Sequence, residues 1–313
     1  MRAITLAKTG GTEHFQMVDM EKPGVAENEV LIEVKALSVN PVDYKVRTNE
    51  DVLTMIYGPE RPAILGWDVA GLVVDKGEMV SRFKTGDRVF GMVNFLGAGK
   101  AYAEYVASPM DHLSLIPDDV SYKDAAVSTL AALTALQVLK NKIGKGDRVL
   151  IHAGSGGVGH FAIQIAKSMG AYVISTSSSR NKDFIYSLGA DEHIDYRKQA
   201  FQDVLSDIDF VFDMFNGDTL FNSLKVLKKG GRVVSIPSPD FSNEILGLAK
   251  EKNIDLSFHM VQSNAEDMEE IARLLNTKKL KPSISKSYSF SQIADAHAQL
   301  ESGRTVGKLV IEL

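Results

Sequence analysis

Three glycines at a fixed spacing lie in the segment that carries the clearest chemistry of this chain, residues 149–167. Val149–Ala153 is apolar and β-prone, Gly154, Gly156 and Gly159 satisfy G-x-G-x-x-G, and the residues after them continue at helical spacing. A strand, a tight turn and a helix in this order present unpaired N–H groups and the positive end of the helix dipole to an anion. The segment therefore predicts a site for the phosphates of a dinucleotide.

Each glycine has a mechanical reason in such a turn. One lets the strand turn sharply, one lets the backbone approach a pyrophosphate that a Cβ would block, and one lets the helix pack close to the strand. The spacing alone is about as typical of an ordinary turn as of a cofactor site. The strand before it, the helix after it and the strand–helix pairs downstream favour the dinucleotide site.

The residues after the second predicted strand, Tyr172–Thr176, indicate which dinucleotide binds. An NAD enzyme usually has an acidic residue there, about 20 residues after the glycines, which bonds the ribose 2′-hydroxyl. This chain has none, and Ser177, Ser178 and Arg180 instead supply hydroxyl and guanidinium donors that suit a 2′-phosphate. We therefore predict NADPH. The alternative is a serine-rich loop in which Arg180 is a solvated charge.

Composition and charge exclude several classes of protein. Of the 313 residues, 44% are hydrophobic and 24% are charged, which is typical of a globular enzyme, and the length favours two domains. The net charge of −5 argues against a nucleic acid or a membrane as partner. No run approaches the roughly 18 apolar residues of a membrane span, and the first residues lack the pattern of a signal peptide. We expect a cytoplasmic protein.

The absence of cysteine removes disulfides, thiol catalysis and every zinc site that needs a thiolate. The seven histidines do not replace them, since none has H-x-x-x-H or H-E-x-x-H spacing. We therefore expect no metal.

Two domains are predicted from the order of the elements. Residues 1–115 alternate short β-rich runs with turns, and the closing strand Lys308–Leu313 is expected to join them, so that 1–115 with 281–313 form one domain. Residues 116–280 form the other. It begins with an apolar helical stretch, Ser121–Lys142, that we expect to lie between the domains.

Strands alternate with helices from residue 146 to about residue 260, which predicts a doubly wound parallel sheet and an α/β fold. The predicted strands are Val149–Ala153, Tyr172–Thr176, Glu192–Ile194, Ile208–Asp213, Arg232–Ile236 and Asp255–Met260. The apolar last strand could pair across a two-fold axis in a homodimer, or its edge could be covered within the monomer.

Blocks of sequence spread over nearly the whole chain carry a family resemblance. They are Ala36–Arg47 (ALSVNPVDYKVR), Ile64–Gly71 (ILGWDVAG), Gly86–Gly91 (GDRVFG), Ala101–Val106 (AYAEYV), Ala125–Leu139 (AAVSTLAALTALQVL), Leu188–Tyr196 (LGADEHIDY), Gly230–Ile236 (GGRVVSI) and Gly307–Val310 (GKLV). With the glycine turn, they resemble a zinc-independent medium-chain dehydrogenase/reductase of the quinone oxidoreductase group, close to its NADPH-dependent alkenal/enone reductases. The resemblance implies a GroES-like irregular β domain and a Rossmann domain.

The resemblance also bears on zinc. Zinc-bearing relatives place a Cys where this sequence has Asn40, and Gly-His-Glu where it has Gly66, Trp67 and Asp68. Without a Lewis acid to polarise a plain carbonyl, the substrate must bring its own electron sink. A quinone or an α,β-unsaturated carbonyl does so, because the negative charge that follows hydride addition spreads to an oxygen.

Candidate catalytic residues lie in the block NPVDYK. Lys45 could donate a hydrogen bond to the developing enolate, but the resemblance favours a contact with NADPH. Asn40 could donate to a carbonyl oxygen or to the cofactor ribose, and Asp43 could orient either Lys45 or Asn40. Tyr44 and Tyr57 are candidate proton relays. Against these roles, Asn-Pro is a common turn signal, and the residues after it are often solvated.

Further cofactor contacts follow from the resemblance alone. They are Thr134 near the nicotinamide, Gly157 and Val158 at the pyrophosphate, Tyr196 at the 2′-phosphate or adenine, and Phe215 with Ile236 at the nicotinamide ribose. If these residues bind no ligand, Tyr196 could simply end a strand, and Phe215 and Ile236 could be core residues.

Two functional classes remain open. One is a quinone or enone reductase, and the other is a redox-silent NADPH-binding protein of the same fold. A short-chain dehydrogenase is disfavoured, since no Tyr has Lys four positions later. The substrate's identity depends on the loops Thr48–Pro62 and Asn94–Lys100, whose paths the sequence does not give.

Overall fold

The chain forms two compact units in this computed structural model, which describes residues 1–313. The β unit comprises Met1–Leu133, Val261–Lys278 and Pro282–Leu313. The parallel-sheet unit comprises Thr134–Met260 and Lys279–Lys281.

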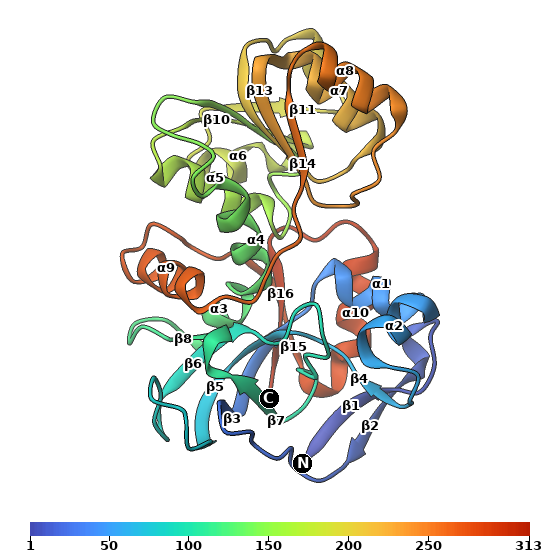
Figure 1. The fold of residues 1–313 in the computed structure, drawn as a ribbon, viewed down its shortest axis with the longest axis vertical. Helices are drawn as coiled ribbons and strands as arrows, with labels where there is room; N and C mark the ends of the chain where they lie inside the picture. Colours follow the sequence, from blue (N-terminus) through green and yellow to red (C-terminus); the bar gives the residue numbers. More distant parts are fainter. The chain divides into compact units, whose positions relative to one another are not determined.

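The β unit is built on a seven-stranded sheet with strands in the order β15-β16-β3-β5-β6-β8, with β7 paired to β3, and on a smaller sheet of order β2-β1-β4. Its strands are β1 Arg2–Leu6, β2 Phe15–Asp19, β3 Glu29–Ser38, β4 Ala63–Ile64, β5 Asp68–Lys76, β6 Arg88–Met92, β7 Tyr105–Pro109, β8 Leu113–Leu115, β15 Ile284–Ser289 and β16 Lys308–Glu312. The strand β16, from the C-terminal end of the chain, pairs antiparallel with β3, and Ile311 lies opposite Leu37 (Figure 1). Residues from both ends of the chain therefore share one sheet.

Short helices pack around these sheets. They are α1 Pro41–Thr48, α2 Glu50–Tyr57, α3 Tyr122–Val127, α9 Ala265–Asn276 and α10 Ile293–Glu301, with α4 Leu130–Leu139 leading out of the unit. The helical stretch predicted over Ser121–Lys142 contains two helices, because Ser128 and Thr129 separate α3 from α4. The Thr129 hydroxyl donates to the carbonyl of Ala126 at 2.8 Å, which is the kind of local bond that competes with helix continuation. Ser121 does cap α3, accepting from the backbone N–H of Asp124.

The parallel-sheet unit confirms the predicted doubly wound α/β fold. Six strands, all parallel, run in the order β11-β10-β9-β12-β13-β14, which is the order of a dinucleotide-binding sheet. They are β9 Arg148–Ile151, β10 Tyr172–Ser177, β11 Glu192–Asp195, β12 Ile208–Asp213, β13 Leu227–Ser235 and β14 Asp255–Phe258.

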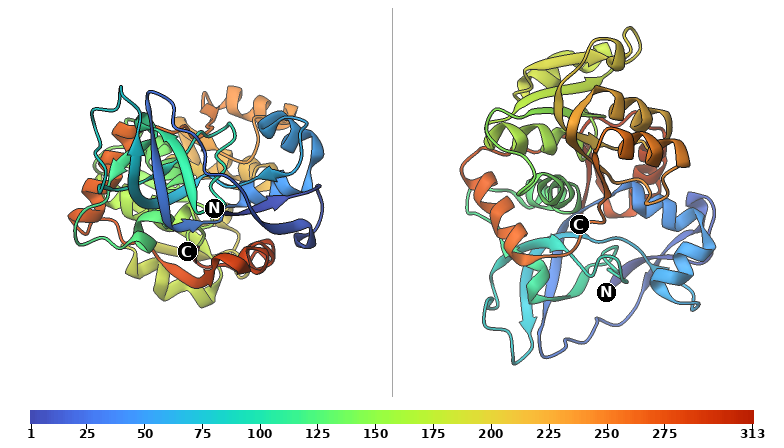
Figure 2. Two further views of the ribbon diagram at one scale, coloured as in Figure 1. Left: turned by 90° about the horizontal axis from the view of Figure 1, so that it is seen from below. Right: turned by 45° about the horizontal axis from the view of Figure 1, so that its top comes forward.

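Helices cover both faces of this sheet. Helices α5 Gly159–Ser168 and α6 Lys182–Ser187 lie on one side, and α7 Gly217–Val226 and α8 Asn243–Glu251 lie on the other (Figures 1 and 2). On the second side, Leu220, Leu224 and Ile245 pack on strand residues such as Leu150 and Val211 in one buried cluster. Buried strands of this kind bring their carboxyl ends to one edge, where a ligand can bind. No helix in the structure combines the length and the apolar character needed to cross a bilayer.

Candidate functional site

The glycine turn connects β9 to α5, and close packing explains two of its three glycines. A Cβ on Gly159 would lie 2.2 Å from the carbonyl oxygen of Ala153, and a Cβ on Gly154 would lie 1.9 Å from the Ser175 hydroxyl on β10. Neither position has room for a side chain. The left-handed residue of the turn is Ala153, with a φ of 49°, so the sharp bend does not come from a glycine.

The third glycine, Gly156, is less crowded. A Cβ there would meet only the Ala153 carbonyl oxygen, at 3.2 Å. Val158, which precedes the first helical residue of α5, gives the helix no side-chain cap. Backbone without a Cβ, next to an uncapped helix N-terminus, fits the phosphates of a dinucleotide. Gly157 lies between these two residues in the same turn.

The carboxyl end of β10 carries the residues predicted to select NADPH. The strand ends at Ser177, and neither it nor the next residue is acidic. Ser177 and Ser178 are buried, and the Ser177 hydroxyl is hydrogen-bonded to His193 at 2.8 Å. Arg180 is exposed, so its guanidinium is accessible to a ligand.

The neighbouring strand brings a second predicted residue to the same edge. The backbone N–H of Tyr196 donates to the Ser177 carbonyl at 3.3 Å, and Tyr196 is 56% exposed. The guanidinium of Arg197 lies 5.7 Å from the centre of that ring. Sequence reasoning missed Arg197, although its position next to Tyr196 is a signal that could have drawn attention to a second cation.

Phe215 and Ile236 follow β12 and β13 at the same edge of the sheet. Phe215 is 57% exposed, so it is not a core residue, whereas Ile236 is half-buried. The buried carboxyl of Asp213 accepts from the Phe215 N–H and from the Ser235 hydroxyl, at 3.2 and 2.7 Å. Burial raises the pKa of this carboxyl. The predicted contacts of Phe215, Ile236 and Thr134, which is 5% exposed on α4, remain predictions.

In the β unit, the candidate catalytic residue Asn40 belongs to a buried polar cluster. Asn40 is 1% exposed, and its side-chain amide donates to Asp68 Oδ2 at 2.7 Å. Its amide oxygen accepts from the ammonium of Lys308, which also donates to the Val39 carbonyl at 3.1 Å. The Ser38 hydroxyl donates to the same Asp68 oxygen at 2.6 Å. The spacing of the residues in the sequence did not predict this cluster.

Asp43 and Lys45 both lie on α1 but face different surroundings. Asp43 is fully buried and accepts from the Asn40 N–H at 2.6 Å at the start of the helix, and its own N–H donates to the Asn40 carbonyl at 2.9 Å. Lys45 is exposed. The sequence predicted either Lys45 or Asn40 as the partner of Asp43, and in the structure Asp43 bonds to Asn40. Direct contacts of Asn40, Asp43 and Lys45 with substrate or cofactor remain predictions.

The electrostatics of Asp43 are unusual. Burial raises the pKa of its carboxyl to about 7; the Asn40 N–H opposes this shift, the charge of Asp68 adds to it, and Lys308 and Tyr102 oppose it. The Tyr102 hydroxyl is hydrogen-bonded to His297 at 2.9 Å. We therefore expect Asp43 to change its charge near neutral pH.

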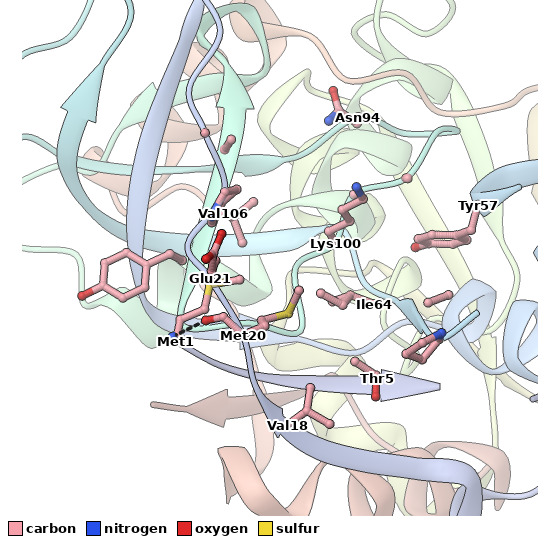
Figure 3. A pocket seen from close by; sticks show the side chains of 18 of the residues that line it. Met1, Thr5, Val18, Met20, Glu21, Tyr57, Ile64, Asn94, Lys100 and Val106 are labelled. Carbon is pink, nitrogen blue, oxygen red and sulfur yellow. Dashed lines mark hydrogen bonds between the residues drawn. The ribbon is translucent and has the colours of Figure 1, made fainter. Parts of the chain in front are cut away.

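A cavity of about 800 Å³ lies within the β unit, where Figure 3 shows Tyr57, Lys100, Ile64 and Met20. Both segments expected to line the substrate pocket contribute to it, Tyr57 from α2 and Asn94 with Lys100 from the second segment. The first segment is not simply a loop, because it contains α2. The Tyr57 hydroxyl is buried and has no hydrogen-bond partner. Burial, with the charge of Asp43 adding to it, raises the pKa of this phenol, so the phenol stays protonated at neutral pH.

No group of three or more His, Cys, Asp and Glu side chains in the structure is arranged to hold a metal ion. Among the positions compared above with zinc-bearing relatives, Asn40 and Asp68 bond to each other, and Trp67 is a fully buried side chain with no metal-ligating atom.

Comparisons with known proteins decide the family. The alcohol dehydrogenase GroES-like domain matches residues 26–118, and the zinc-binding dehydrogenase family matches residues 188–311. The quinone-oxidoreductase homolog of Spinacia oleracea chloroplasts is 33% identical over 97% of this chain and 95% of its own length. The chain belongs to the quinone oxidoreductase group of the medium-chain dehydrogenase/reductases. The predicted family resemblance is thereby confirmed, and the protein is an oxidoreductase.

Two further members of this family are informative. The NADPH-dependent alkenal/one oxidoreductase of Arabidopsis thaliana chloroplasts is 31% identical over 99% of this chain and 79% of its own length. The Escherichia coli quinone oxidoreductase, solved in complex with NADPH, matches all of this chain and all of its own with a TM-score of 0.88 and 27% identity. The predicted GroES-like and Rossmann architecture of this quinone oxidoreductase-group protein is confirmed.

Proposed function

We propose that this protein uses NADPH to reduce a quinone or an α,β-unsaturated carbonyl compound without zinc. The observation that carries the proposal is the edge of the parallel sheet, where an uncapped, glycine-lined helix start lies beside a strand end with serines and Arg180 but no acid. When bound, NADPH supplies a hydride to the electron-poor carbon of the acceptor. The names of the spinach and Arabidopsis relatives support both acceptor classes.

The chain's own residues then bind and orient the reactants. The turn from Gly154 to Gly159 receives the pyrophosphate, Arg180 with Ser178 and Tyr196 receives the 2′-phosphate, and Phe215 with Ile236 borders the nicotinamide ribose. Lys45 contacts the cofactor from α1. The charge that develops on the acceptor oxygen needs preorganised donors, and the Tyr57 hydroxyl is one that has no other partner.

Zinc independence is proposed from the donors at the ligand positions. Both oxygens of Asp68 already accept hydrogen bonds, and the Asn40 amide oxygen accepts from Lys308. The ammonium of Lys308 thus lies where a zinc ion would have to bind, beside the amide of Asn40 and the single carboxylate of Asp68. This donor set does not suit zinc, which prefers thiolate and imidazole ligands.

Steady oxidation of NADPH, followed by absorbance with a quinone and with an enone as acceptors, tests the proposal. Wild-type protein and a Lys45→Ala variant are compared. Turnover with either acceptor class, reduced in the variant, supports the proposed reductase. Tight NADPH binding with no turnover of any acceptor would favour a redox-silent NADPH-binding protein.

Arg180→Ala is expected to weaken NADPH binding by about 10- to 100-fold while NADH binding changes little. The reason is the loss of a charge-assisted hydrogen bond, typically about 1.5–3 kcal/mol, to the 2′-phosphate. Fluorescence titration of both coenzymes measures the change. Lys229→Ala, which removes an equal charge from an exposed position on β13, is the matched control and should alter neither affinity. Equal losses for NADH and NADPH would contradict the assignment of Arg180.

Tyr57→Phe is expected to raise the KM of the acceptor by about 5- to 10-fold, because the acceptor loses one hydrogen bond of about 1–1.5 kcal/mol. The same change should leave the thermal midpoint unchanged or slightly higher, since the hydroxyl has no partner in the free protein. Steady-state kinetics and thermal unfolding, measured on the same samples, check both parts. A lower midpoint with an unchanged KM would show that the hydroxyl serves the fold and not the acceptor.

A further inference from the structure

Lys308 is buried, with only 3% of its surface exposed, although its side chain bears a charge. Its ammonium donates to the Asn40 amide oxygen and to the Val39 carbonyl, and it lies 3.6 Å from Asp68 Oδ2. A buried ammonium is retained only where a counter-charge and hydrogen-bond acceptors surround it. Lys308 and Asp68 therefore form an ion pair inside the β unit.

This ion pair determines how the Asn40 side chain is oriented. The ammonium of Lys308 has only donors, so it selects the amide oxygen of Asn40, and the carboxylate of Asp68 has only acceptors, so it selects the amide nitrogen. If the charge of Lys308 or of Asp68 is removed, the Asn40 amide loses one of the two interactions that fix its orientation. Asn40 is the N-cap residue of α1, the helix that carries Lys45, and its backbone carbonyl accepts from the Asp43 N–H.

The other oxygen of Asp68 reaches a second helix. Asp68 Oδ1 accepts from the backbone N–H of Leu130, the first residue of α4, at 3.0 Å. Thr134 follows in the next turn of the same helix. One buried ion pair thus bonds to the starts of the two helices that carry Lys45 and Thr134, two of the residues predicted to contact the cofactor.

The charges within this part of the unit balance when Asp43 is protonated. Lys308 is positive and Asp68 negative, while burial favours the neutral form of Asp43. Removing the ammonium would leave the Asp68 carboxylate buried beside hydroxyl and amide donors without a counter-ion.

We propose that Lys308 is a positioning residue for the reaction: through Asp68 and Asn40, its ammonium holds the starts of α1 and α4 in the arrangement that bound cofactor requires. The inference rests on the proposed function for its kinetic readout. It assigns to Lys308 no contact with substrate or cofactor.

Chemical rescue tests this inference. Lys308→Ala removes three methylenes and the ammonium, which are the atoms of n-propylammonium. We expect the variant to lose about tenfold or more in kcat, since small displacements of positioning groups have effects of that size. Added n-propylammonium should restore kcat in a saturable manner. Tetramethylammonium at equal ionic strength should not, because it has the charge but no N–H donor. Wild-type protein with n-propylammonium controls for reaction of the amine with the acceptor.

Lys252→Ala is the matched control variant. Lys252 donates to three backbone carbonyls, at 2.7, 2.8 and 2.7 Å, and none of these three bonds is to a carboxylate. Its loss should change stability without a kcat defect that n-propylammonium rescues. An unchanged kcat in Lys308→Ala, or a loss that n-propylammonium does not reverse, would overturn the inference. If Lys308→Ala does not fold, Lys308→Met is measured in its place. For this variant, separate determination of kcat and KM replaces the rescue experiment. An unchanged kcat again overturns the inference.

NADPH affinity is measured by fluorescence on the same samples, which separates the two proposals. A wild-type protein that binds NADPH but turns over no acceptor would defeat the proposed reductase. In that case the inference about Lys308 still stands or falls on whether Lys308→Ala weakens NADPH binding and n-propylammonium restores it.

Discussion

Gly159→Ala is expected to destabilise the parallel-sheet unit by about 3 kcal/mol or more and, by displacing the start of α5, to abolish NADPH binding. The added Cβ would lie 2.2 Å from the Ala153 carbonyl oxygen and 2.7 Å from the Gly154 Cα. Both are backbone atoms, so α5 could accept the methyl group only by moving away from β9. Urea unfolding followed by far-ultraviolet circular dichroism, with a fluorescence titration of NADPH, measures both effects.

Two other glycines of the same unit provide matched comparisons. Gly156→Ala should fold, because its Cβ would meet one atom at 3.2 Å, yet it should bind NADPH about 10- to 100-fold more weakly if the Cβ occupies the space of the pyrophosphate. Gly247→Ala, in α8, would meet nothing within 4 Å and should stabilise the unit by about 0.5–1 kcal/mol. If Gly156→Ala binds NADPH as wild type does, the turn is not the phosphate site.

Asp43→Asn is expected to remove a pH dependence of stability that wild type shows between about pH 4 and pH 7. Burial raises the pKa of Asp43 in the folded protein to about 7, above its unfolded value of 3.8. The neutral form is therefore favoured by folding, its contribution is fully present below pH 3.8, and it is lost as the pH rises through 7. About three pKa units correspond to a loss on the order of 4 kcal/mol.

The variant isolates this effect because asparagine stays neutral at every pH and can still accept from the Asn40 N–H. Its stability relative to wild type should be near zero at pH 4 and should increase up to pH 7. The single tryptophan, Trp67, is fully buried in the β unit, so its fluorescence during urea unfolding reports on this unit. Asp51→Asn, at an exposed position of α2, is the control. A wild-type–variant difference that does not change with pH would show that Asp43 does not titrate in this range.

Local patterns in the sequence were sufficient for the parallel-sheet unit. The alternation of apolar strands with helices predicted its α/β fold, and the glycine spacing located the turn between β9 and α5. The missing acid after β10 could also be read directly, because the strand end and the residues next to it are contiguous in the chain. Such features depend on neighbours a few residues away, which a sequence displays.

The tertiary structure alone decided what surrounds Asn40. Lys308 and Asn40 are 268 residues apart, and only the pairing of β16 with β3 brings the ammonium to the amide. The same is true of Asp43, which the sequence could pair equally with Lys45 or Asn40, and which burial of one face of α1 directs inward. Burial and charge pairing depend on segments that meet only after folding, so the sequence named the residues and the fold determined their partners.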